Sequence, residues 1–217
     1  MNTLIVDLDQ RIAASSRPDF HGVKTVAEHW RRNDFQWWEE ALRTNPSYAE
    51  QQKAIEEWLC GWSFPRILEL GPCTGRVTRI LAPVARGPLQ LVEVNERHYQ
   101  QLRAEFPNAD IHHADLTQLK WHRQIPFSLI AVVEVLVHIP NVEELMRRIH
   151  HALSPEGQAL VSITPLTWYQ EHYKEQPTVH RGIDRQEFEE FVSKMFRFIE
   201  VHTSTSGQHI TYWLEKI

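Results

Sequence analysis

The sequence predicts an α/β fold: a doubly wound, mainly parallel seven-stranded sheet with an antiparallel C-terminal hairpin and a helical N-terminal cap. From Phe64 onward, short apolar runs alternate with segments of helical periodicity, a pattern typical of parallel sheets with helices on both faces. The run 127–133 is apolar almost throughout, as expected for a strand buried on both faces. The last two apolar runs are joined by a short turn at Ser206 and Gly207, which is too short for a helical crossover.

The N-terminal segment, residues 1–62, is expected to form the helical cap, and residues 63–217 the core. The stretch Asp34–Leu42 predicts a helix that is capped by its first residue. The stretch Ser47–Glu50 has the spacing of a capping box, which predicts that Ser47 caps a second helix. Gly61 is expected to end that helix.

Local signals predict each element of the core. Asn141 and Glu144 form a second capping box, and Asp184 is placed to cap the last helix. Pro83 is expected to stop a helix, and Leu153–Gly157 reads as a turn. The expected strands are 67–70, 89–93, 109–112, 127–133, 159–163, 198–203 and 209–214, and the expected helices are 76–82, 97–106, 142–152 and the one after Asp184.

Composition restricts the partners and the cellular setting. The chain has 217 residues and a net charge of −5, which argues against a general nucleic-acid binder because phosphate neutralisation needs a basic face. A membrane helix needs about 20 consecutive apolar residues, and every apolar run in this sequence is much shorter. The N-terminus lacks the pattern of a secretion signal. Cys60 and Cys73 are too few for a disulfide framework. We therefore expect a cytoplasmic protein with no membrane partner.

Four acidic residues lie at or just beyond the carboxyl ends of expected strands, and the first of them, Glu69, precedes a glycine turn. The carboxyl ends of parallel strands meet at one edge, where such sheets bind ligands. Glu93 offers two oxygens to the hydroxyls of a ribose, and Asp115 can accept from the exocyclic amine of adenine. Gly71 and Gly75 allow the backbone to approach a ligand closely, and the amides around Thr74 and Arg76 can hold an anion where the next helix begins. The four acids of this nucleoside-binding crevice are Glu69, Glu93, Asp115 and Glu134.

The glycine spacing narrows the choice of nucleoside. Gly71 and Gly75 stand as Gly-x-x-x-Gly, whereas a dinucleotide site has Gly-x-Gly-x-x-Gly. A phosphate-loop Gly-Lys-Ser/Thr is absent from the sequence. Glu69 comes just before the turn, where it would repel a pyrophosphate and attract a cationic ligand.

Five segments of the core resemble motifs of class I S-adenosylmethionine-dependent methyltransferases, in the same order. Glu69–Gly75 resembles their Glu-x-Gly-x-Gly-x-Gly motif, Glu93 their ribose-binding acid, and Asp115-Leu116 their adenine-contacting position. Val133–Pro140 resembles the stretch after the fourth strand, and Leu153–Gly157 the Leu-x-Pro-x-Gly turn. The resemblance implies a Rossmann-like fold and S-adenosyl-L-methionine as cofactor. The cofactor-binding residues that it implies are Glu69, Gly71, Pro72, Cys73, Thr74, Gly75, Glu93, Val94, Asp115, Leu116 and Glu134.

The chain departs from the family pattern at three positions. Cys73 replaces the middle glycine of the turn, where its side chain is expected to crowd the methionine moiety. Ser128 stands where the family often has an aspartate, and Asn95 stands where it often has a serine, so that Asn95 is expected to share ribose recognition.

His138 is the candidate catalytic base. Methyl transfer to a hydroxyl requires removal of a proton, and histidine is suited to that near neutral pH. The alternative is a structural histidine that is hydrogen-bonded to a neighbouring loop, and the sequence leaves both readings open. Glu134 and His138 also resemble part of the Glu-x-x-Glu-His metal motif of small-RNA 2′-O-methyltransferases. Val137 replaces the second glutamate, so we expect no metal site.

The acceptor is expected to be a small molecule, methylated on oxygen or nitrogen, as in small-molecule biosynthesis. Two alternatives stay open: an RNA 2′-O-methyltransferase, against which the acidic charge and the broken metal motif argue, and a catalytically silent, cofactor-binding scaffold subunit. A homodimer is also left open. The candidate residues for the acceptor pocket are Trp37, Trp38, His138, Trp168, Tyr169, His180 and Arg181.

Overall fold

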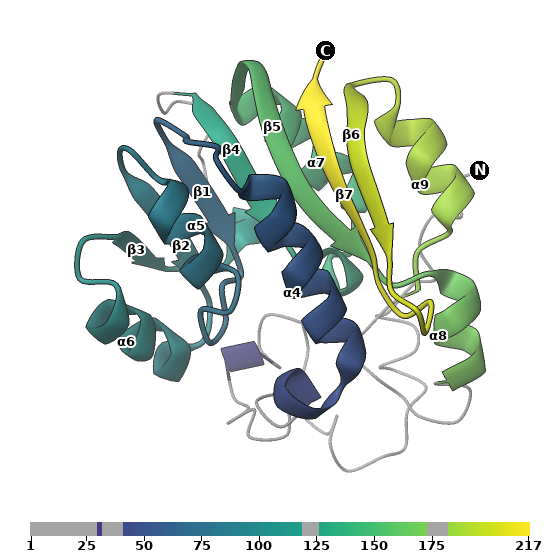
Figure 1. Cartoon of the computed structure of the whole chain (residues 1–217), viewed down its shortest axis with the longest axis horizontal. Helices are drawn as coiled ribbons and strands as arrows, with labels where there is room; N and C mark the ends of the chain where they lie inside the picture. Colours follow the sequence, from purple (N-terminus) through teal and green to yellow (C-terminus); the bar gives the residue numbers. More distant parts are fainter. Residues whose placement is uncertain (1–29, 32–40, 119–125, 173–181) are drawn as a thin grey trace.

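The computed structural model describes residues 30–31, 41–118, 126–172 and 182–217. In this part of the chain lies a sheet of seven strands in the order β3-β2-β1-β4-β5-β7-β6 (Figure 1). The strands are β1 Ile67–Leu70, β2 Leu89–Glu93, β3 Asp110–His113, β4 Phe127–Val132, β5 Leu153–Ile163, β6 Phe196–Thr203 and β7 Ile210–Lys216. The first five are parallel, and β7 lies antiparallel between β5 and β6. The fold class predicted from the sequence is confirmed.

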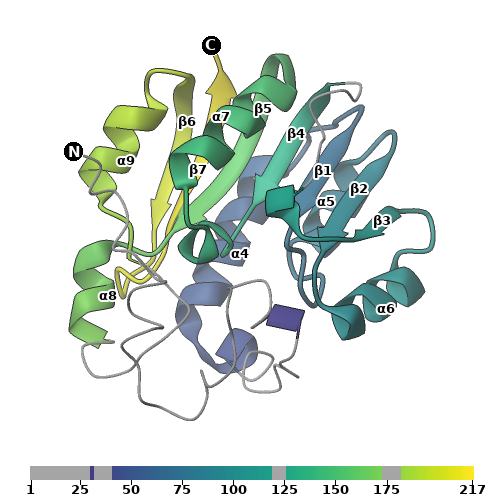
Figure 2. The ribbon, with the colours of Figure 1, turned by 180° about the vertical axis from the view of Figure 1, so that it is seen from behind.

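Helices cover both faces of the sheet. α4 and α5 lie in front of it in Figure 1, and α7 and α9 lie on the opposite face in Figure 2. The described helices are α4 Pro46–Leu59, α5 Thr78–Val84, α6 Glu96–Glu105, α7 Val142–Ala152, α8 Leu166–His172 and α9 Arg185–Val192, with short 3₁₀ turns at Leu116–Gln118 and Leu136–His138. None of these helices combines the length and the apolar character needed to cross a bilayer.

Two hydrophobic cores follow from the alternation of side chains along the strands. Leu68 and Leu70 pack into the core under α7 and α9, whereas Ile67 packs with Ile55 and Leu59 of α4. Successive strand residues point to opposite faces, so both sides of β1 are buried. The division into a cap, 1–62, and a core, 63–217, stays a prediction.

β1 lies between β2 and β4 and pairs with both in parallel. The direction in which strands are added to the sheet reverses between β1 and β4. Consecutive strands are added outward from β1 toward β3, and the chain then crosses back to β4. The loops after β1 and β4 therefore diverge, and a crevice opens outside their carboxyl ends. These ends point toward the lower part of Figure 1, beside the N-terminal end of α4.

Several predicted boundaries are corrected by the structure. Asn45, not Ser47, caps α4: its side chain accepts a hydrogen bond from the Ser47 amide at 3.0 Å, and Pro46 occupies the first helical position. Proline is favoured there because that position needs no amide donor. The expected turn at Leu153–Gly157 belongs to β5, because Leu153 already pairs with Phe127 before the register shifts.

The other boundaries agree within a few residues. Asn141 caps α7 and Asp184 caps α9, each through its side-chain oxygen. Gly61 follows the end of α4 with φ of 79°, as a helix C-terminus favours. α5 begins at Thr78 instead of Arg76 and contains Pro83. α8 was not predicted, and most of the expected helix Asp34–Leu42 lies outside the described residues.

Candidate functional site

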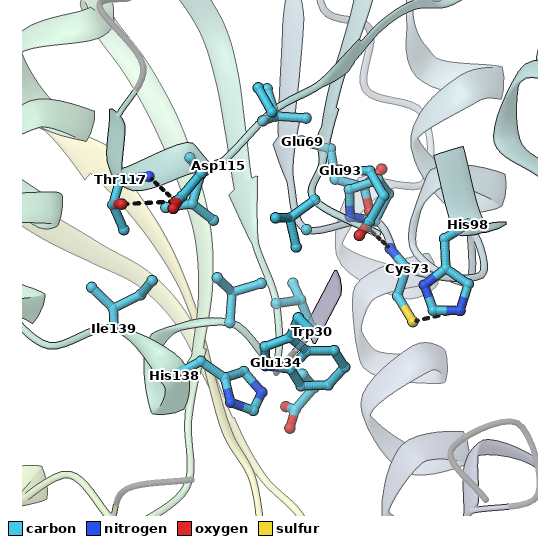
Figure 3. A pocket seen from close by; sticks show the side chains of 18 of the residues that line it. Trp30, Glu69, Cys73, Glu93, His98, Asp115, Thr117, Glu134, His138 and Ile139 are labelled. Carbon is cyan, nitrogen blue, oxygen red and sulfur yellow. Dashed lines mark hydrogen bonds between the residues drawn. The ribbon is translucent and has the colours of Figure 1, made fainter. Parts of the chain in front are cut away.

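A cavity of about 480 Å³ lies at the crevice between β1 and β4, within the range typical of small-molecule sites. Its wall is built from the loops that follow the parallel strands. It includes every residue predicted to bind the cofactor except Gly75: Glu69, Gly71, Pro72, Cys73, Thr74, Glu93, Val94, Asp115, Leu116 and Glu134. Figure 3 shows acidic side chains on both sides of this cavity. The structure thus brings these residues to one cavity, while the cofactor role of each residue stays a prediction.

The turn after β1 can only be built with unusual backbone angles. Gly71 has φ of 70°, and a Cβ added there would lie 2.6 Å from Cγ2 of Val135. Gly75 has φ of 82° and packs beneath Phe106, which explains why it does not face the cavity. Cys73 has φ of 52° although it is not a glycine, a conformation that few side chains tolerate. The residue that departs from the family motif thus keeps the conformation of a glycine.

Glu93 joins the turn after β1 to the end of β2. Its Oε2 accepts a hydrogen bond from the Cys73 amide at 2.9 Å, and its Oε1 accepts one from the Asn95 amide at 2.8 Å. Burial raises the pKa of Glu93, and these backbone hydrogen bonds oppose that rise. Each carboxylate oxygen can accept more than one hydrogen bond, so Glu93 retains acceptor capacity toward the cavity.

The side chain of Asn95 is occupied elsewhere. It accepts from the His98 amide, which caps α6, and donates to the Trp30 carbonyl at 2.7 Å. Asn95 does not line the cavity. The structure therefore gives Asn95 a contact with Trp30, an N-terminal tryptophan that is not among the predicted site residues.

Glu69 is a buried carboxyl at the end of β1. Thr78 donates a hydrogen bond from Oγ1 to its Oε2 at 2.7 Å. Burial raises the pKa of Glu69 to about 7, against the hydrogen bond from Thr78 and the positive charge of Arg76. A cationic ligand group beside Glu69 would stabilise its ionised form.

Asp115 is held in a fixed orientation on the opposite side of the cavity. Its Oδ1 accepts hydrogen bonds from the amide of Thr117 at 2.9 Å and from its hydroxyl at 2.7 Å. Ile139 also lines this side, beneath Asp115 (Figure 3), and with Leu116 it supplies apolar surface for a flat ring. The arrangement suits an adenine with its amine toward the second oxygen of Asp115.

Glu134 lines the cavity but its carboxylate is bound by protein groups. Oε1 accepts from Gln51 and from Ser162, each at 2.8 Å, and Oε2 lies 3.1 Å from Nδ1 of His209. Burial alone would raise the pKa of Glu134, but His209 and these hydrogen bonds lower it to about 2. Glu134 therefore links α4, β5 and His209, the residue just before β7, at the wall of the cavity.

His138 ends the 3₁₀ turn Leu136–His138 and lies at the cavity wall. Its ring meets the ring of Trp30 edge to face, with 4.5 Å between the centroids (Figure 3). This places an imidazole at the end of the cavity where Trp30 and Glu134 also lie. The location agrees with the predicted catalytic base, and the catalytic role stays a prediction.

The other acceptor candidates are not brought to the cavity. Trp168 and Tyr169 lie on α8, where Trp168 stacks on His172 with 4.0 Å between ring centroids and Tyr169 is buried. Neither lines the cavity. Trp37, Trp38, His180 and Arg181 lie outside the described residues. In the described part of the chain, no group of three or more His, Cys, Asp or Glu side chains is placed to hold a metal ion.

Sequence reasoning missed several lining residues. Trp30 and Arg31 come from the N-terminal segment and carry no motif. Arg76 directly follows Gly75, and the sequence pointed to its backbone amide but not to its side chain, which lines the cavity. His98 comes from α6 and places Nε2 4.0 Å from Sγ of Cys73. Its burial lowers the pKa of His98 to about 4, so it is neutral at pH 7.

Comparisons with known proteins show that the sequence and the fold are similar to those of methyltransferases. A family model described as a methyltransferase domain matches residues 21–216. The N-methyltransferase NodS from Bradyrhizobium japonicum WM9, crystallised with S-adenosyl-L-homocysteine, is similar with a TM-score of 0.70 and 16% identity over 88% of this chain and 96% of that one. Magnesium protoporphyrin IX methyltransferase from Synechocystis PCC 6803, with the same ligand bound, gives a TM-score of 0.71 and 11% identity over 88% and 98% of the two chains. No curated protein sequence matches the chain.

Proposed function

Since the chain belongs to the methyltransferase domain family, we propose that it transfers a methyl group from S-adenosyl-L-methionine to an oxygen or nitrogen atom of a small-molecule acceptor. The observation that carries the proposal is that Glu69, Glu93 and Asp115 line one cavity at the switch point between β1 and β4. Two of the similar structures were crystallised with S-adenosyl-L-homocysteine, the demethylated product of this cofactor.

The residues of the cavity fit the parts of this cofactor. Glu93, held by two amides, suits the ribose hydroxyls, and Asp115 suits the adenine amine. Glu69 suits the ammonium of the amino-acid end, because a nearby cation stabilises its ionised form. Val135 packs directly against the backbone of Gly71, where it leaves no room for a Cβ, and this packing holds the turn at the wall of the cavity.

The cofactor supplies an activated methyl group on a sulfonium, and the chain supplies position and proton transfer. Trp30, Leu42 and Ile139 line the cavity with apolar surface, which excludes water from the reacting atoms. Holding the acceptor in line with the methyl group can lower the activation free energy by about 7–11 kcal/mol. His138 would take the proton of a hydroxyl acceptor, whereas a neutral amine needs less help from a base.

Calorimetry tests the cofactor assignment. We expect S-adenosyl-L-methionine and S-adenosyl-L-homocysteine to bind the purified protein and NADH not to bind. Binding of NADH alone would overturn the proposal. Transfer of labelled methyl to a panel of phenols and amines then tests the reaction. Cofactor binding without transfer would favour the silent scaffold subunit, and transfer to RNA only with added manganese would favour the RNA 2′-O-methyltransferase.

The proposal also includes the cellular compartment and the oligomeric state of the protein. Cys60 and Cys73 are not disulfide-bonded, which supports a reducing compartment such as the cytoplasm. A homodimer stays a proposal for which light scattering of the purified protein is the direct measurement.

A further inference from the structure

Trp30 is held at the cavity wall by residues from two different loops. Its backbone carbonyl accepts a hydrogen bond at 2.7 Å from Nδ2 of Asn95, which follows β2. Its ring meets the ring of His138, which follows β4, with 4.5 Å between the centroids and 74° between the planes (Figure 3). The loops after β2 and β4 thus place one large aromatic side chain at the wall of the cavity.

Asn95 makes its contact with Trp30 through a group that serine, the residue often found at this position in the family, does not have. The Oδ1 atom of Asn95 accepts from the His98 amide at 3.1 Å and caps α6, and a serine hydroxyl can provide the same cap. The Nδ2 atom is the donor to the Trp30 carbonyl. The departure from the family pattern therefore keeps the helix cap and adds a tie to Trp30.

Apolar side chains extend the wall that Trp30 forms. Trp30 and Leu42 pack around the buried ring of Tyr48, and both also line the cavity. Ile139 and Pro140 directly follow His138 and line the same cavity. A large, rigid aromatic ring in such a wall binds a second ring more favourably than burial of area alone would give.

The charged groups near this wall are compensated within the protein. Gln51 donates to Oε1 of Glu134 at 2.8 Å, and His209 lies 3.1 Å from Oε2. Gln51 also accepts from Nη2 of Arg76 at 2.6 Å, so it bridges two opposite charges. Burial lowers the pKa of Arg76, and the charge of Glu134 opposes this effect. Arg31 lines the cavity as well, but it is exposed, where water and salt screen its charge.

We propose that this cavity selects a flat, uncharged aromatic acceptor that stacks on Trp30, and that Asn95 is the positioning residue for Trp30. The inference rests on the proposed function and names the class of its acceptor. Since the rings of Trp30 and His138 stand at 74°, a ring stacked on Trp30 turns its edge toward the imidazole. An acceptor atom on that edge is then within reach of His138.

Two alcohols with the same carbon skeleton separate stacking from simple burial. The probe 2-naphthol is flat and aromatic, whereas decahydro-2-naphthol is saturated and puckered, and both are uncharged at neutral pH. Calorimetry would measure each alcohol at saturating S-adenosyl-L-homocysteine with the wild type, Trp30→Ala, Trp30→Phe and Asn95→Ser. Trp62→Ala is the matched control, because Trp62 follows α4, is 46% exposed and does not line the cavity.

We expect the wild type and Trp62→Ala to bind 2-naphthol about 3- to 10-fold more tightly than decahydro-2-naphthol. Trp30→Ala should abolish this preference, and Trp30→Phe should keep part of it because a smaller ring still stacks. Asn95→Ser should reduce the preference while the affinity for S-adenosyl-L-homocysteine stays within a few-fold of the wild type, because the serine keeps the cap of α6.

Equal affinities of the wild type for the two alcohols would overturn the aromatic assignment, as would equal losses for both in Trp30→Ala. An unchanged preference in Asn95→Ser would overturn the positioning role of Asn95. If Trp30→Ala did not fold, a full wild-type preference in both Trp30→Phe and Asn95→Ser would overturn the proposal. Binding of S-adenosyl-L-homocysteine but of neither alcohol would sink the acceptor class alone, whereas no binding of S-adenosyl-L-homocysteine would sink the proposed function itself.

Discussion

The amide of Cys73 donates a hydrogen bond to Oε2 of Glu93 at 2.9 Å. This bond ties the glycine turn after β1 to the end of β2, so it couples two segments that line the cavity. The same carboxylate also accepts from the Asn95 amide. Glu93 therefore braces the two segments and also lines the cavity.

For Glu93→Gln we expect loss of affinity for both S-adenosyl-L-homocysteine and 5′-methylthioadenosine, by at least about 10-fold. The amides of Cys73 and Asn95 contact different oxygens of Glu93, and a glutamine replaces one of these oxygens with an NH2 donor, which would face a backbone N–H. Calorimetry with both ligands measures the effect. Glu200→Gln, an exposed position on β6, is the control. Retained affinity for 5′-methylthioadenosine would contradict a ribose role for Glu93.

Glu69 makes cofactor binding depend on pH. Its pKa is raised to about 7, chiefly by burial, so the free protein carries a neutral Glu69 below that pH and a carboxylate above it. Only the carboxylate attracts an ammonium. We expect the affinity for S-adenosyl-L-homocysteine to rise between pH 6 and pH 8, and Glu69→Gln to bind more weakly with a flatter profile. A wild-type profile as flat as that of the variant would refute this role.

The same pKa affects the stability of the ligand-free protein. A buried carboxyl with a raised pKa holds its proton longer in the folded state than in the unfolded state, so stability falls as pH rises from 4.5 to about 7. Each unit of pKa shift corresponds to about 1.4 kcal/mol, so Glu69 lowers the free energy of unfolding by about 3 kcal/mol over this pH range. Denaturant unfolding of the wild type and of Glu69→Gln across this range measures it. The variant should lose less stability as pH rises, and equal slopes for both proteins would contradict the assignment.

Gly71 and Val135 constrain each other. An alanine at Gly71 would face a positive φ and a contact of 2.6 Å with Cγ2 of Val135. We expect Gly71→Ala to lower the free energy of unfolding by about 2–4 kcal/mol. The double variant Gly71→Ala/Val135→Ala should show favourable coupling of about 1 kcal/mol, because the smaller side chain removes the clash but not the backbone strain. Strictly additive effects in denaturant titrations would exclude that clash.

The contribution of His138 to kcat is expected to depend on whether the acceptor atom is oxygen or nitrogen. With a hydroxyl acceptor, His138→Asn should lower kcat about 100- to 10,000-fold, while the affinity for S-adenosyl-L-homocysteine stays within a few-fold. With a neutral amine acceptor, the loss should be small. Steady-state kinetics with both acceptor types check this, with His151→Asn on the exposed side of α7 as the control. An equal loss of kcat for both acceptors would instead indicate a structural histidine packed against Trp30.

Local chemistry explains why most of the fold could be predicted from the sequence. The alternation of apolar runs and helical segments reports burial on both faces of β1 and β4, and the caps Asn141 and Asp184 act within one helical turn. The cap of α4 was assigned to Ser47 instead of Asn45 because both residue types are good caps, and only the backbone decides between them. The hydroxyl of Ser47 instead contacts that of Ser206, 159 residues away, at 2.7 Å.

The sequence by itself determined the strand–turn–helix pattern, the acids that follow the parallel strands and hence the edge of the sheet where the cavity lies, because these depend on periodicity and on spacing along the chain. Only the tertiary structure decided which side chains from distant segments meet there. It brings Gln51 of α4 to Glu134 and Arg76, and it sets Trp30 against His138. It also turns Trp168 and Tyr169 away. Contacts between distant segments depend on how helices pack on the sheet, and no local pattern of residues encodes that packing.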